Sequence, residues 1–193
     1  MQKAIKRIFD VIFALLVLAV LAPVWIVLAI WIAVTSPGGV FFRQKRTGYK
    51  GREFDMLKFR SMYINREADT LQATGNDPRI TPVGRFLRRS SLDELPQLWN
   101  VVIGDMSVIG PRPHMLSHTD YYAPRIHDYM RRHDMRPGLT GYAQVKGFRG
   151  ATPTIKDMEN RVCADLEYVD KFSLWLDVKI LFLTVWKMLT LKL

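Results

Sequence analysis

Residues Val11–Val34 read VIFALLVLAVLAPVWIVLAIWIAV, a run of 24 residues without a formal charge. A helix rises about 1.5 Å per residue, so a run of this length can cross a hydrocarbon core of about 30 Å. The run continues through Trp25 and Trp31 without the small-residue cleavage site that ends a signal peptide. We therefore expect a retained membrane segment.

Pro23 stands near the middle of this run and is expected to break the helix, because proline lacks an N–H donor and clashes with the carbonyl four residues earlier. Basic residues flank the run on both sides: Lys3, Lys6 and Arg7 precede it, and Arg43, Lys45 and Arg46 follow it. The positive-inside rule then favours two cytoplasmic ends, which a helix that enters one leaflet, bends and returns would satisfy. From the segment alone, a kinked transmembrane helix is an equal alternative.

The composition changes from apolar to mixed after Ser36-Pro37-Gly38-Gly39, which indicates a boundary near residue 38. We expect residues 1–38 to form a membrane anchor and residues 39–193 to form a cytoplasmic domain at the membrane interface. Within that domain, Val40–Arg46 and Glu53–Met62 are aromatic-rich and are separated by Gly48-Tyr49-Lys50-Gly51. Such a pair of stretches around a glycine-containing turn predicts a β-hairpin.

The rest of the chain favours helices. Thr81-Pro82 is typical of an N-cap followed by proline at the first helical position, and further helices are predicted over Pro96–Val102, Tyr121–His133 and Ile155–Val169. Phe172–Leu193 is apolar but carries charges along its length, which favours an amphipathic helix in the headgroup layer over a full span. A final core helix of a soluble domain is the alternative. The expected class is α+β: a mostly helical monotopic membrane protein with a re-entrant helix-break-helix, a small β-hairpin and interfacial amphipathic helices.

The charge of the chain indicates an anionic partner. Lys and Arg number 28 against 18 Asp and Glu, which gives a net charge of +10 and favours nucleic acid, phospholipid or a phosphorylated small molecule. Cys163 is the only cysteine, so no intramolecular disulfide can form. The four histidines, His114, His118, His127 and His133, do not follow a zinc pattern, and no P-loop or dinucleotide-binding glycine pattern is present.

Two adjacent carboxylates, Asp93 and Glu94, stand where a helix is expected to begin. A capping box formed by Ser91 and Glu94 explains them without any function, and from these letters alone it is the preferred interpretation. The alternative is chemical, because Arg85, Arg88 and Arg89 precede the pair and a helix N-terminus suits phosphate. Positive surroundings keep a carboxylate ionised, and an ionised aspartate can attack phosphorus.

Further candidates for phosphate binding are Lys58 and Arg60 in Lys58–Met62, Arg112 in Gly110–Pro113, and Arg136 in Arg136–Gly141. A guanidinium offers phosphate two parallel hydrogen bonds. In the last two motifs the prolines also restrict the backbone, and a surface turn is the alternative interpretation of both. Mg²⁺ is the expected metal, because it uses one or two carboxylates and completes its shell with phosphates and water. Asp93 is its candidate ligand.

Taken together, these motifs resemble the bacterial sugar transferase family, the monotopic phosphoglycosyl transferases that start lipid-linked glycan assembly. The resemblance covers nearly the whole chain and includes KFRSM at 58–62, RRSSLDELPQ at 88–97, GDMS at 104–107, GPRP at 110–113 and RPGLTG at 136–141. It implies Asp93 as the nucleophile that takes up the phosphosugar, Glu94 as its partner, Mg²⁺ at the diphosphate, and Arg112 in phosphate or nucleotide binding. It also favours the re-entrant helix, although the break here is Ala22-Pro23 where similar proteins often have Ser-Pro.

The function implied by this resemblance is transfer of a hexose 1-phosphate from a UDP-sugar to undecaprenyl phosphate through a covalent aspartyl-phosphosugar intermediate. This would be the first membrane step of exopolysaccharide, capsule or lipopolysaccharide O-antigen synthesis, on the cytoplasmic face of the bacterial inner membrane. The run from His114 to Gly150 is similar to enzymes that use UDP-glucose or UDP-galactose. Longer relatives carry extra amino-terminal membrane helices, so the chain is expected to correspond to their catalytic part.

Binding residues expected in this function are Lys58, Arg60, Arg88, Arg112 and Arg136. A membrane-anchored basic protein that binds nucleic acid or anionic lipid is the competing hypothesis. The basic residues lie near prolines, glycines and a carboxylate pair, and they do not form an uninterrupted stripe with stacking aromatics. We therefore do not expect nucleic acid as a partner, and the sequence does not predict an oligomeric state.

Overall fold

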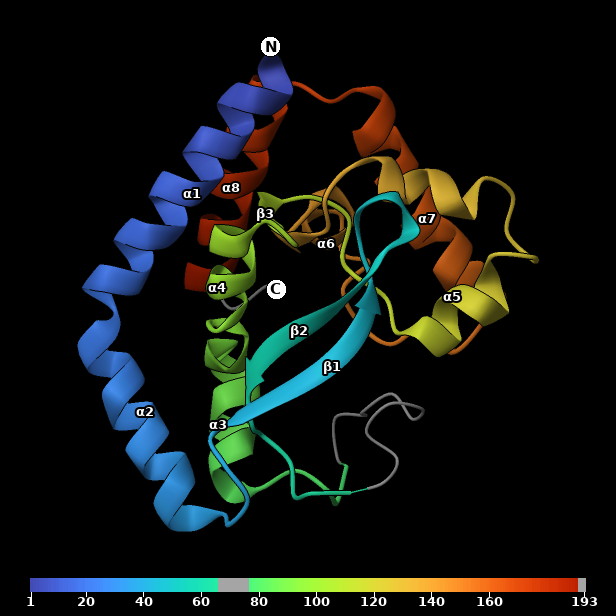
Figure 1. Cartoon of the computed structure of the whole chain (residues 1–193). Helices are drawn as coiled ribbons and strands as arrows, with labels where there is room; N and C mark the ends of the chain where they lie inside the picture. The colour runs from blue at the N-terminus through green and yellow to red at the C-terminus, as the bar shows by residue number, and fades with distance from the viewer. Residues whose placement is uncertain (66–76, 191–193) are drawn as a thin grey trace.

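The computed structural model describes residues 1–65 and 77–190 as a set of helices around two small sheets (Figure 1). This mostly helical α+β arrangement confirms the coarse prediction. The elements are α1 Gln2–Val20, α2 Ala22–Thr35, β1 Phe41–Thr47, β2 Glu53–Phe59, α3 Pro82–Ser90, α4 Gln97–Ile103, β3 Ser107–Ile109, α5 Leu116–Tyr122, β4 Gly138–Thr140, α6 Tyr142–Val145, α7 Ile155–Asp170 and α8 Leu174–Leu189. Three 3₁₀ turns accompany them: η1 Tyr49–Gly51, η2 Leu92–Glu94 and η3 Tyr129–Asp134.

The predicted break in the apolar segment is confirmed. α1 and α2 meet at Leu21 and are bent by 64°, with Pro23 in the first turn of α2, where its missing N–H has no helical acceptor to lose. Within the described part of the chain, no single helix is long and apolar enough to cross a membrane. α1 and α2 together meet that test of length and composition.

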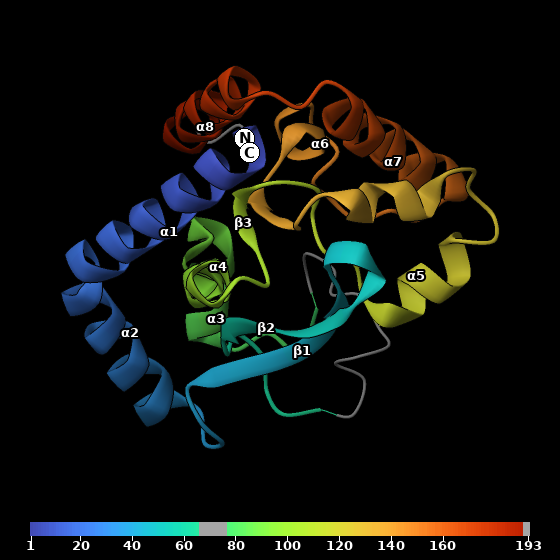
Figure 2. The ribbon, with the colours of Figure 1, turned by 45° about the horizontal axis from the view of Figure 1, so that its top comes forward.

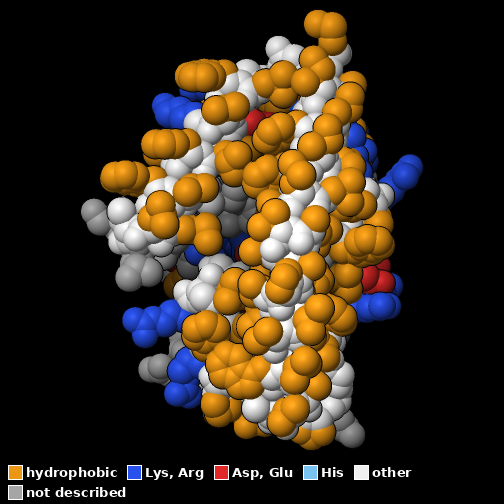
Figure 3. Space-filling view, turned by 90° about the vertical axis from the view of Figure 1, so that its left-hand side faces the viewer, with side chains coloured by type: hydrophobic (Ala, Val, Ile, Leu, Met, Phe, Trp, Pro, Cys, Tyr) orange, Lys and Arg blue, Asp and Glu red, His pale blue; other side chains and the backbone are white. Residues whose placement is uncertain are grey.

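One face of the molecule is apolar. Hydrophobic side chains dominate the side where α1 and α2 lie (Figure 3). Helix α8 adds to this surface. The exposed apolar side chains are Ile5, Ile8, Phe9, Ile12 and Leu16 of α1, Ile26, Val27, Ile30 and Trp31 of α2, and Trp175, Phe182, Val185, Trp186 and Leu189 of α8, among others. We call this surface the apolar face. An exposed apolar surface of such extent indicates contact with lipid or with another protein.

Buried polar contacts join the bent helix pair to the rest of the fold. α8 lies beside the N-terminal part of α1 in both ribbon views (Figures 1 and 2). Between them, Lys6 donates to Asp177 at 2.7 Å and lies 3.7 Å from Asp10, and all three side chains are buried. Asp10 in turn accepts from the Ser107 hydroxyl at 2.7 Å and from the backbone N–H of Val108 at 3.1 Å. Because each buried charge has a partner, this network fixes α1 against α8 and β3.

The predicted hairpin is also confirmed. β1 and β2 pair antiparallel from Phe41↔Phe59 to Thr47↔Glu53, and β2 ends at Phe59 instead of Met62. The side chain of Asn100 docks β2 onto α4, because it accepts from the backbone N–H of Leu57 at 2.9 Å and donates to the carbonyl of Asp55 at 2.8 Å. The hairpin is therefore held against the helix that follows Asp93 and Glu94.

β3 and β4 form a second, parallel sheet in the register Ser107↔Gly138 and Ile109↔Thr140. Their flanking segments approach so closely that only glycine fits. A Cβ on Gly110 would lie 2.2 Å from the carbonyl oxygen of Arg136, and one on Gly138 would lie 2.1 Å from the nitrogen of Gly110. The two Arg-Pro motifs of the sequence consequently belong to one small sheet.

Most predicted helices form. Thr81 caps α3 by accepting from the N–H of Gly84 at 2.8 Å, and α4, α7 and α8 occupy the expected stretches. The prediction of one helix over Tyr121–His133 is wrong. α5 ends at Tyr122, and the chain continues through Pro124 to η3, since proline cannot supply the N–H that a helix would need there.

Candidate active site

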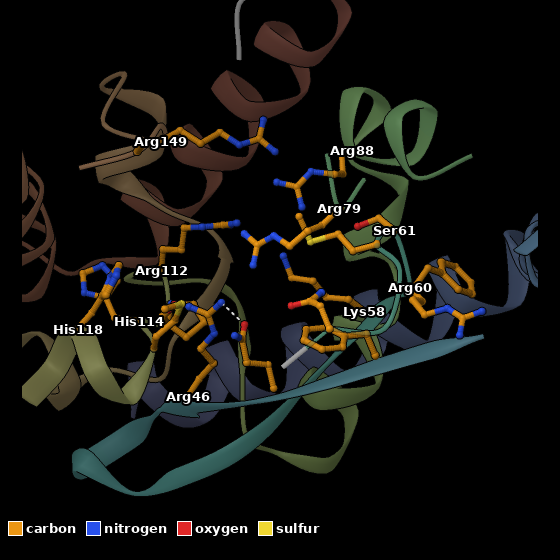
Figure 4. Close-up of a pocket in the computed structure, with 18 of the residues that line it drawn as sticks. Arg46, Lys58, Arg60, Ser61, Arg79, Arg88, Arg112, His114, His118 and Arg149 are labelled. Carbon is orange, nitrogen blue, oxygen red and sulfur yellow. Dashed lines mark hydrogen bonds between the residues drawn. The ribbon is translucent and has the colours of Figure 1, made fainter. Parts of the chain in front are cut away.

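A pocket of about 390 Å³ opens between the hairpin, α3 and the segment that follows β3 (Figure 4). Cationic side chains gather in its wall: Arg46, Lys58, Arg79, Arg88, Arg112, Arg149 and Arg161. The wall also holds aromatic and imidazole rings from Phe42, Phe59, Tyr63, His114 and His118. This combination suits a ligand that carries phosphate groups and an uncharged polar part.

Asp93 and Glu94 lie in η2, beside this pocket, and are 5% and 9% exposed. α3 ends at Ser90, and the next residue, Ser91, adopts a left-handed conformation at φ 58° and turns the chain inward. The Glu94 carboxylate accepts from Arg112 at 2.5 Å and from Lys58 at 3.1 Å. The fold thus brings two cations, from β2 and from the turn after β3, onto the carboxylate pair.

The capping-box interpretation of Ser91 and Glu94 is wrong. An N-cap residue needs an extended backbone, whereas Ser91 is left-handed and its side chain caps no helix. The Ser91 hydroxyl instead accepts from Arg149 at 2.9 Å, and Glu94 is bound by Lys58 and Arg112. Both members of the expected capping box therefore contact residues of the pocket.

Burial and charge act differently on the two carboxyls. Burial would raise the pKa of Glu94, but Arg112 and Lys58 outweigh it and hold that pKa well below its ordinary value. For Asp93 burial is the larger effect and raises the pKa; Lys58, Arg88 and Arg112 oppose the rise, and Glu94 adds to it. The expected positive surroundings therefore limit the rise in the pKa of Asp93 without reversing it. Glu94 is the ionised partner that holds two cations.

Lys58, Arg88 and Arg112 are brought together by the fold, as the sequence suggested. Figure 4 shows their side chains directed into the same pocket from β2, α3 and the turn after β3. The backbone of Arg112 is fixed by Arg132, which donates to the Arg112 carbonyl at 2.7 Å. Arg132 also binds Asp165 at 2.6 Å, and both side chains are 1% exposed. A fully buried ion pair thus positions the turn that carries Arg112.

Arg60 and Arg136, the other two candidates, have backbone partners. Arg60 contributes to the pocket wall, but its guanidinium is directed away from the pocket in Figure 4 and donates to the carbonyls of Ser36 and Pro37, just after α2. Arg136 donates to the carbonyl of Gly104 at 3.0 Å and lies over the ring of Tyr49. It lines a separate small hollow near Lys3 and Arg7 instead of the pocket beside Asp93.

Sequence reasoning missed four arginines and two histidines in the pocket wall: Arg46, Arg79, Arg149, Arg161, His114 and His118. Arg149 had a weak signal in Gly147-Phe148-Arg149-Gly150, but that stretch suggested only sugar choice. Arg161 gave none, because it sits in the middle of an ordinary helix, where it donates to the carbonyls of Phe148 and Gly150 and so holds the segment that carries Arg149. Burial lowers the pKa of Arg161 to about 10.

The donor atoms fit Mg²⁺ bound together with a phosphorylated ligand. Residues 1–65 and 77–190 contain no group of three or more His, Cys, Asp and Glu side chains that could hold a metal by themselves. Glu94 is engaged by Arg112 and Lys58, which leaves Asp93 as the candidate metal ligand of the pair. Mg²⁺ needs only one or two carboxylates when phosphate oxygens and water complete its shell.

Known proteins share this chain's sequence over almost its full length. The family profile described as "Bacterial sugar transferase" matches residues 1–191. The UDP-glucose:undecaprenyl-phosphate glucose-1-phosphate transferase of Escherichia coli strain K12 is 49% identical over 96% of this chain and 40% of its own length. The UDP-galactose-lipid carrier transferase of Erwinia amylovora is 39% identical over 95% of this chain and 40% of its own. The exopolysaccharide production protein PSS of Rhizobium leguminosarum bv. phaseoli is 43% identical over 98% of both chains.

The chain thus spans about two fifths of the E. coli and Erwinia relatives and nearly all of the Rhizobium protein.

Proposed function

This chain belongs to the bacterial sugar transferase family, and on that premise we propose that it transfers a hexose 1-phosphate from a UDP-sugar to undecaprenyl phosphate. The observation that carries the proposal is the buried Asp93 beside a Glu94 carboxylate that binds both Arg112 and Lys58, at the edge of a cationic pocket. The named activities of two relatives, whose matches cover 96% and 95% of this chain, support it.

The proposed reaction has two displacements at one phosphorus atom. In the first, a carboxylate oxygen of Asp93 attacks the β-phosphorus of the UDP-sugar, the bond to the bridging oxygen breaks, and UMP leaves with the electron pair. In the second, a phosphate oxygen of undecaprenyl phosphate attacks the same phosphorus and the bond to Asp93 breaks. The products are UMP and a polyprenyl diphosphate-sugar, and the Asp93 carboxylate is restored.

The neighbouring residues have distinct roles in this proposal. Arg112 and Lys58, held by Glu94, lie where they can bind the diphosphate, and Arg88 adds positive charge from α3. Because the pKa of Glu94 is held low, Glu94 is suited to orienting these cations and is a poor proton acceptor. Mg²⁺, with Asp93 as its candidate ligand, would neutralise charge on the diphosphate.

Asp93→Asn tests the nucleophile, because it removes the charge and keeps the shape. With a UDP-sugar radiolabelled in its hexose, Mg²⁺ and no lipid acceptor, wild type should retain a labelled sugar phosphate and release UMP, whereas Asp93→Asn should do neither. Asp120→Asn, on the exposed side of α5, is the matched control and should label like wild type. Equal labelling of Asp93→Asn and wild type would reject the covalent role.

The membrane topology is part of the same proposal. Residues 1–38 form a re-entrant anchor, and residues 39–193 lie on the cytoplasmic face of the bacterial inner membrane with α8 in the headgroup layer. The 64° bend at Leu21 and the exposed apolar side chains on α1, α2 and α8 support this topology. The alternative is a bent helix pair that crosses the bilayer.

Cysteines placed singly at Gln2 and Lys45, in a Cys163→Ser background, separate the two topologies. An impermeant thiol reagent applied to intact spheroplasts should reach neither position, and after permeabilisation it should reach both. Labelling of the Gln2 position alone in intact spheroplasts would establish a crossing and reject the re-entrant anchor.

Glucose and galactose are the proposed sugars, and exopolysaccharide, capsule or O-antigen assembly is the proposed context. The names of the E. coli and Erwinia relatives include UDP-glucose and UDP-galactose, and the Rhizobium relative is named for exopolysaccharide production. A panel of UDP-sugars, assayed by UMP release, tests the choice. UMP release with neither UDP-glucose nor UDP-galactose, but with an N-acetylated donor, would reject it.

A basic protein that binds nucleic acid or anionic lipid is the competing function. It would explain the net charge of +10, but it would not explain why Lys58 and Arg112 converge on a buried carboxylate pair. The labelling experiment separates the hypotheses, since a binding protein forms no sugar phosphate adduct.

A further inference from the structure

A buried histidine in the wall of the pocket has one ring nitrogen without a partner. His114 is 3% exposed, and its Nδ1 lies 2.6 Å from the Tyr129 hydroxyl. Among the residues that the structure describes, nothing hydrogen-bonds its Nε2. His114 is part of the pocket wall and Tyr129 is not. Because Tyr129 engages Nδ1, the buried Nε2 is the ring nitrogen that remains for a ligand.

The uncharged form of the His114 ring is favoured, in contrast to the cationic arginines and lysine that line the same pocket. Burial lowers the pKa of His114 well below its ordinary value, and the charges of Arg132 and Arg161 lower it further. A neutral imidazole has one donor and one acceptor nitrogen, and Nδ1 is already engaged by Tyr129. Nε2 can therefore make a single hydrogen bond. A hydroxyl group is the matching partner, because it can donate or accept and so suits either tautomer.

The position of His114 along the chain indicates which hydroxyl groups it can reach. It follows Arg112 by two residues, and two residues span at most about 7 Å. The Arg112 guanidinium binds Glu94, the neighbour of the proposed nucleophile, so this end of the pocket lies close to the reacting phosphorus. In a UDP-sugar, the hexose is bonded directly to the β-phosphate, whereas the ribose is separated from it by a second phosphate. The hydroxyl groups nearest to the β-phosphorus are therefore those of the hexose.

We propose that Nε2 of His114 hydrogen-bonds a hydroxyl group of the transferred hexose, with Tyr129 holding the ring in place, and that this contact contributes to the choice of sugar. The inference rests on the proposed transferase function and adds to it a specific contact with the uncharged part of the substrate. The arginines of the pocket remain available for the diphosphate.

Two substitutions separate the two ring nitrogens. The amide of Asn reaches about as far as Nδ1, so His114→Asn keeps a partner for Tyr129 and removes the group that would bind the hexose. The amide of Gln reaches about as far as Nε2, so His114→Gln restores a polar group toward the pocket. His133→Asn is the matched control, because His133 is also buried with an unpaired Nε2 but is not in the pocket wall.

The experiment uses the full chain in detergent with Mg²⁺ and a polyprenyl phosphate, and UMP release by wild type first establishes the reaction. For the preferred UDP-hexose, His114→Asn should lower kcat/KM about tenfold, which is the loss of one hydrogen bond to a buried group. Inhibition by UDP, which lacks the hexose, should be unchanged. His114→Gln should fall less than His114→Asn, and His133→Asn should match wild type.

Deoxy analogues of the UDP-hexose, each lacking one hydroxyl group, identify the contact. Wild type should discriminate against one of them, and His114→Asn should use that analogue and the parent UDP-hexose about equally. If every analogue is discriminated equally by both proteins, or if UDP inhibits His114→Asn much more weakly than wild type, the hexose contact is rejected. A wild type that releases no UMP from any UDP-hexose would instead overturn the proposed function on which the inference rests.

Discussion

The turns that carry Arg112 and Arg136 have similar compositions, but their arginines bind different partners. Gly110-Pro111-Arg112-Pro113 combines an arginine with two prolines and a glycine, and Arg136-Pro137-Gly138 combines one with a single proline and a glycine. Both flank the same two-stranded sheet. Arg112 nevertheless reaches the Glu94 carboxylate beside the pocket, whereas Arg136 donates to a backbone carbonyl near α1. The comparison teaches that the residue types of a motif do not determine its role, because the role depends on which partner the arginine side chain reaches.

The directions of the two side chains explain the difference. The backbones of the two turns lie against each other, because the N–H of Gly138 donates to the carbonyl of Pro111 at 3.0 Å. From there Arg112 extends to Glu94 beside the pocket. Arg136 extends to the C-terminus of α4, where it binds the carbonyl of Gly104 and Arg7 binds those of Val101 and Val102. Cations are favoured there because the last carbonyls of a helix carry partial negative charge.

Arg112→Lys is the strongest test of this comparison. Lysine keeps the charge but cannot reproduce the two-pronged contact of a guanidinium, so kcat/KM for the UDP-sugar should fall on the order of 100-fold. Arg136→Lys, in the neighbouring turn, is the matched control and should retain at least half of the wild-type value. Both are measured by UMP release with Mg²⁺ and a polyprenyl phosphate.

A loss of similar size in both variants would show that the two turns act as one unit and would contradict the separation of their roles. An unchanged kcat/KM for Arg112→Lys would return Arg112 to a role in holding Glu94 only. Melting temperatures of both variants accompany the kinetics, so that a loss of folded protein is not read as a loss of binding.

The pH dependence of the first displacement gives a second test of the contrast between the pocket beside Asp93 and the surroundings of Arg136. Burial raises the pKa of Asp93, and Lys58 is the largest influence that lowers it. Asp93 can attack only when ionised, so UMP release should increase with pH through the pKa of Asp93. Lys58→Met removes the lowering influence and should move this rise to higher pH, whereas Arg136→Met should leave it in place.

The measurement is the burst of UMP without lipid acceptor, because the second ionisation of a phosphate monoester, near pH 6, would otherwise overlap the profile. A rise that moves to lower pH in Lys58→Met, or that does not move, would contradict the assigned electrostatics of Asp93. The amplitude of the burst falls as well if Lys58 also binds the diphosphate, but amplitude and midpoint are separate observables.

Features that depend on neighbours in the sequence were predicted correctly. The break at Pro23, the hairpin around Gly48–Gly51 and the cap at Thr81 each follow from local backbone chemistry. The continuous helix over Tyr121–His133 failed because helical spacing was given more weight than Pro124. Element bounds were therefore accessible from the sequence wherever proline and glycine were taken into account.

The candidate site was only partly accessible, because its contacts join distant segments. Asp93 and Glu94 stood out as a pair, but their letters favoured a capping box, and only the left-handed Ser91 and the cations from β2 and the Arg112 turn exclude it. No local pattern could place Arg161 of α7 and His114 in the wall of the same pocket.

The smallest effect is expected for Arg136→Ala, which tests the structural side of the comparison directly. The substitution removes the hydrogen bond to the carbonyl of Gly104 and the contact with the ring of Tyr49, so it should destabilise the fold by about 1 kcal/mol. For a domain of this size, that corresponds to a decrease of roughly 2–4 °C in melting temperature. Arg136 and Gly104 are both half-buried, so in the variant water can reach the Gly104 carbonyl, which limits the loss.

Arg136 lines a different hollow from the pocket beside Asp93, so kcat/KM of Arg136→Ala for the UDP-sugar should stay within twofold of wild type. Tryptophan fluorescence during heating, followed by UMP release on the same preparation, measures both quantities. A tenfold loss of activity at an unchanged melting temperature would place Arg136 in substrate binding after all, and the difference between the two turns would then be one of distance to the substrate instead of one of role.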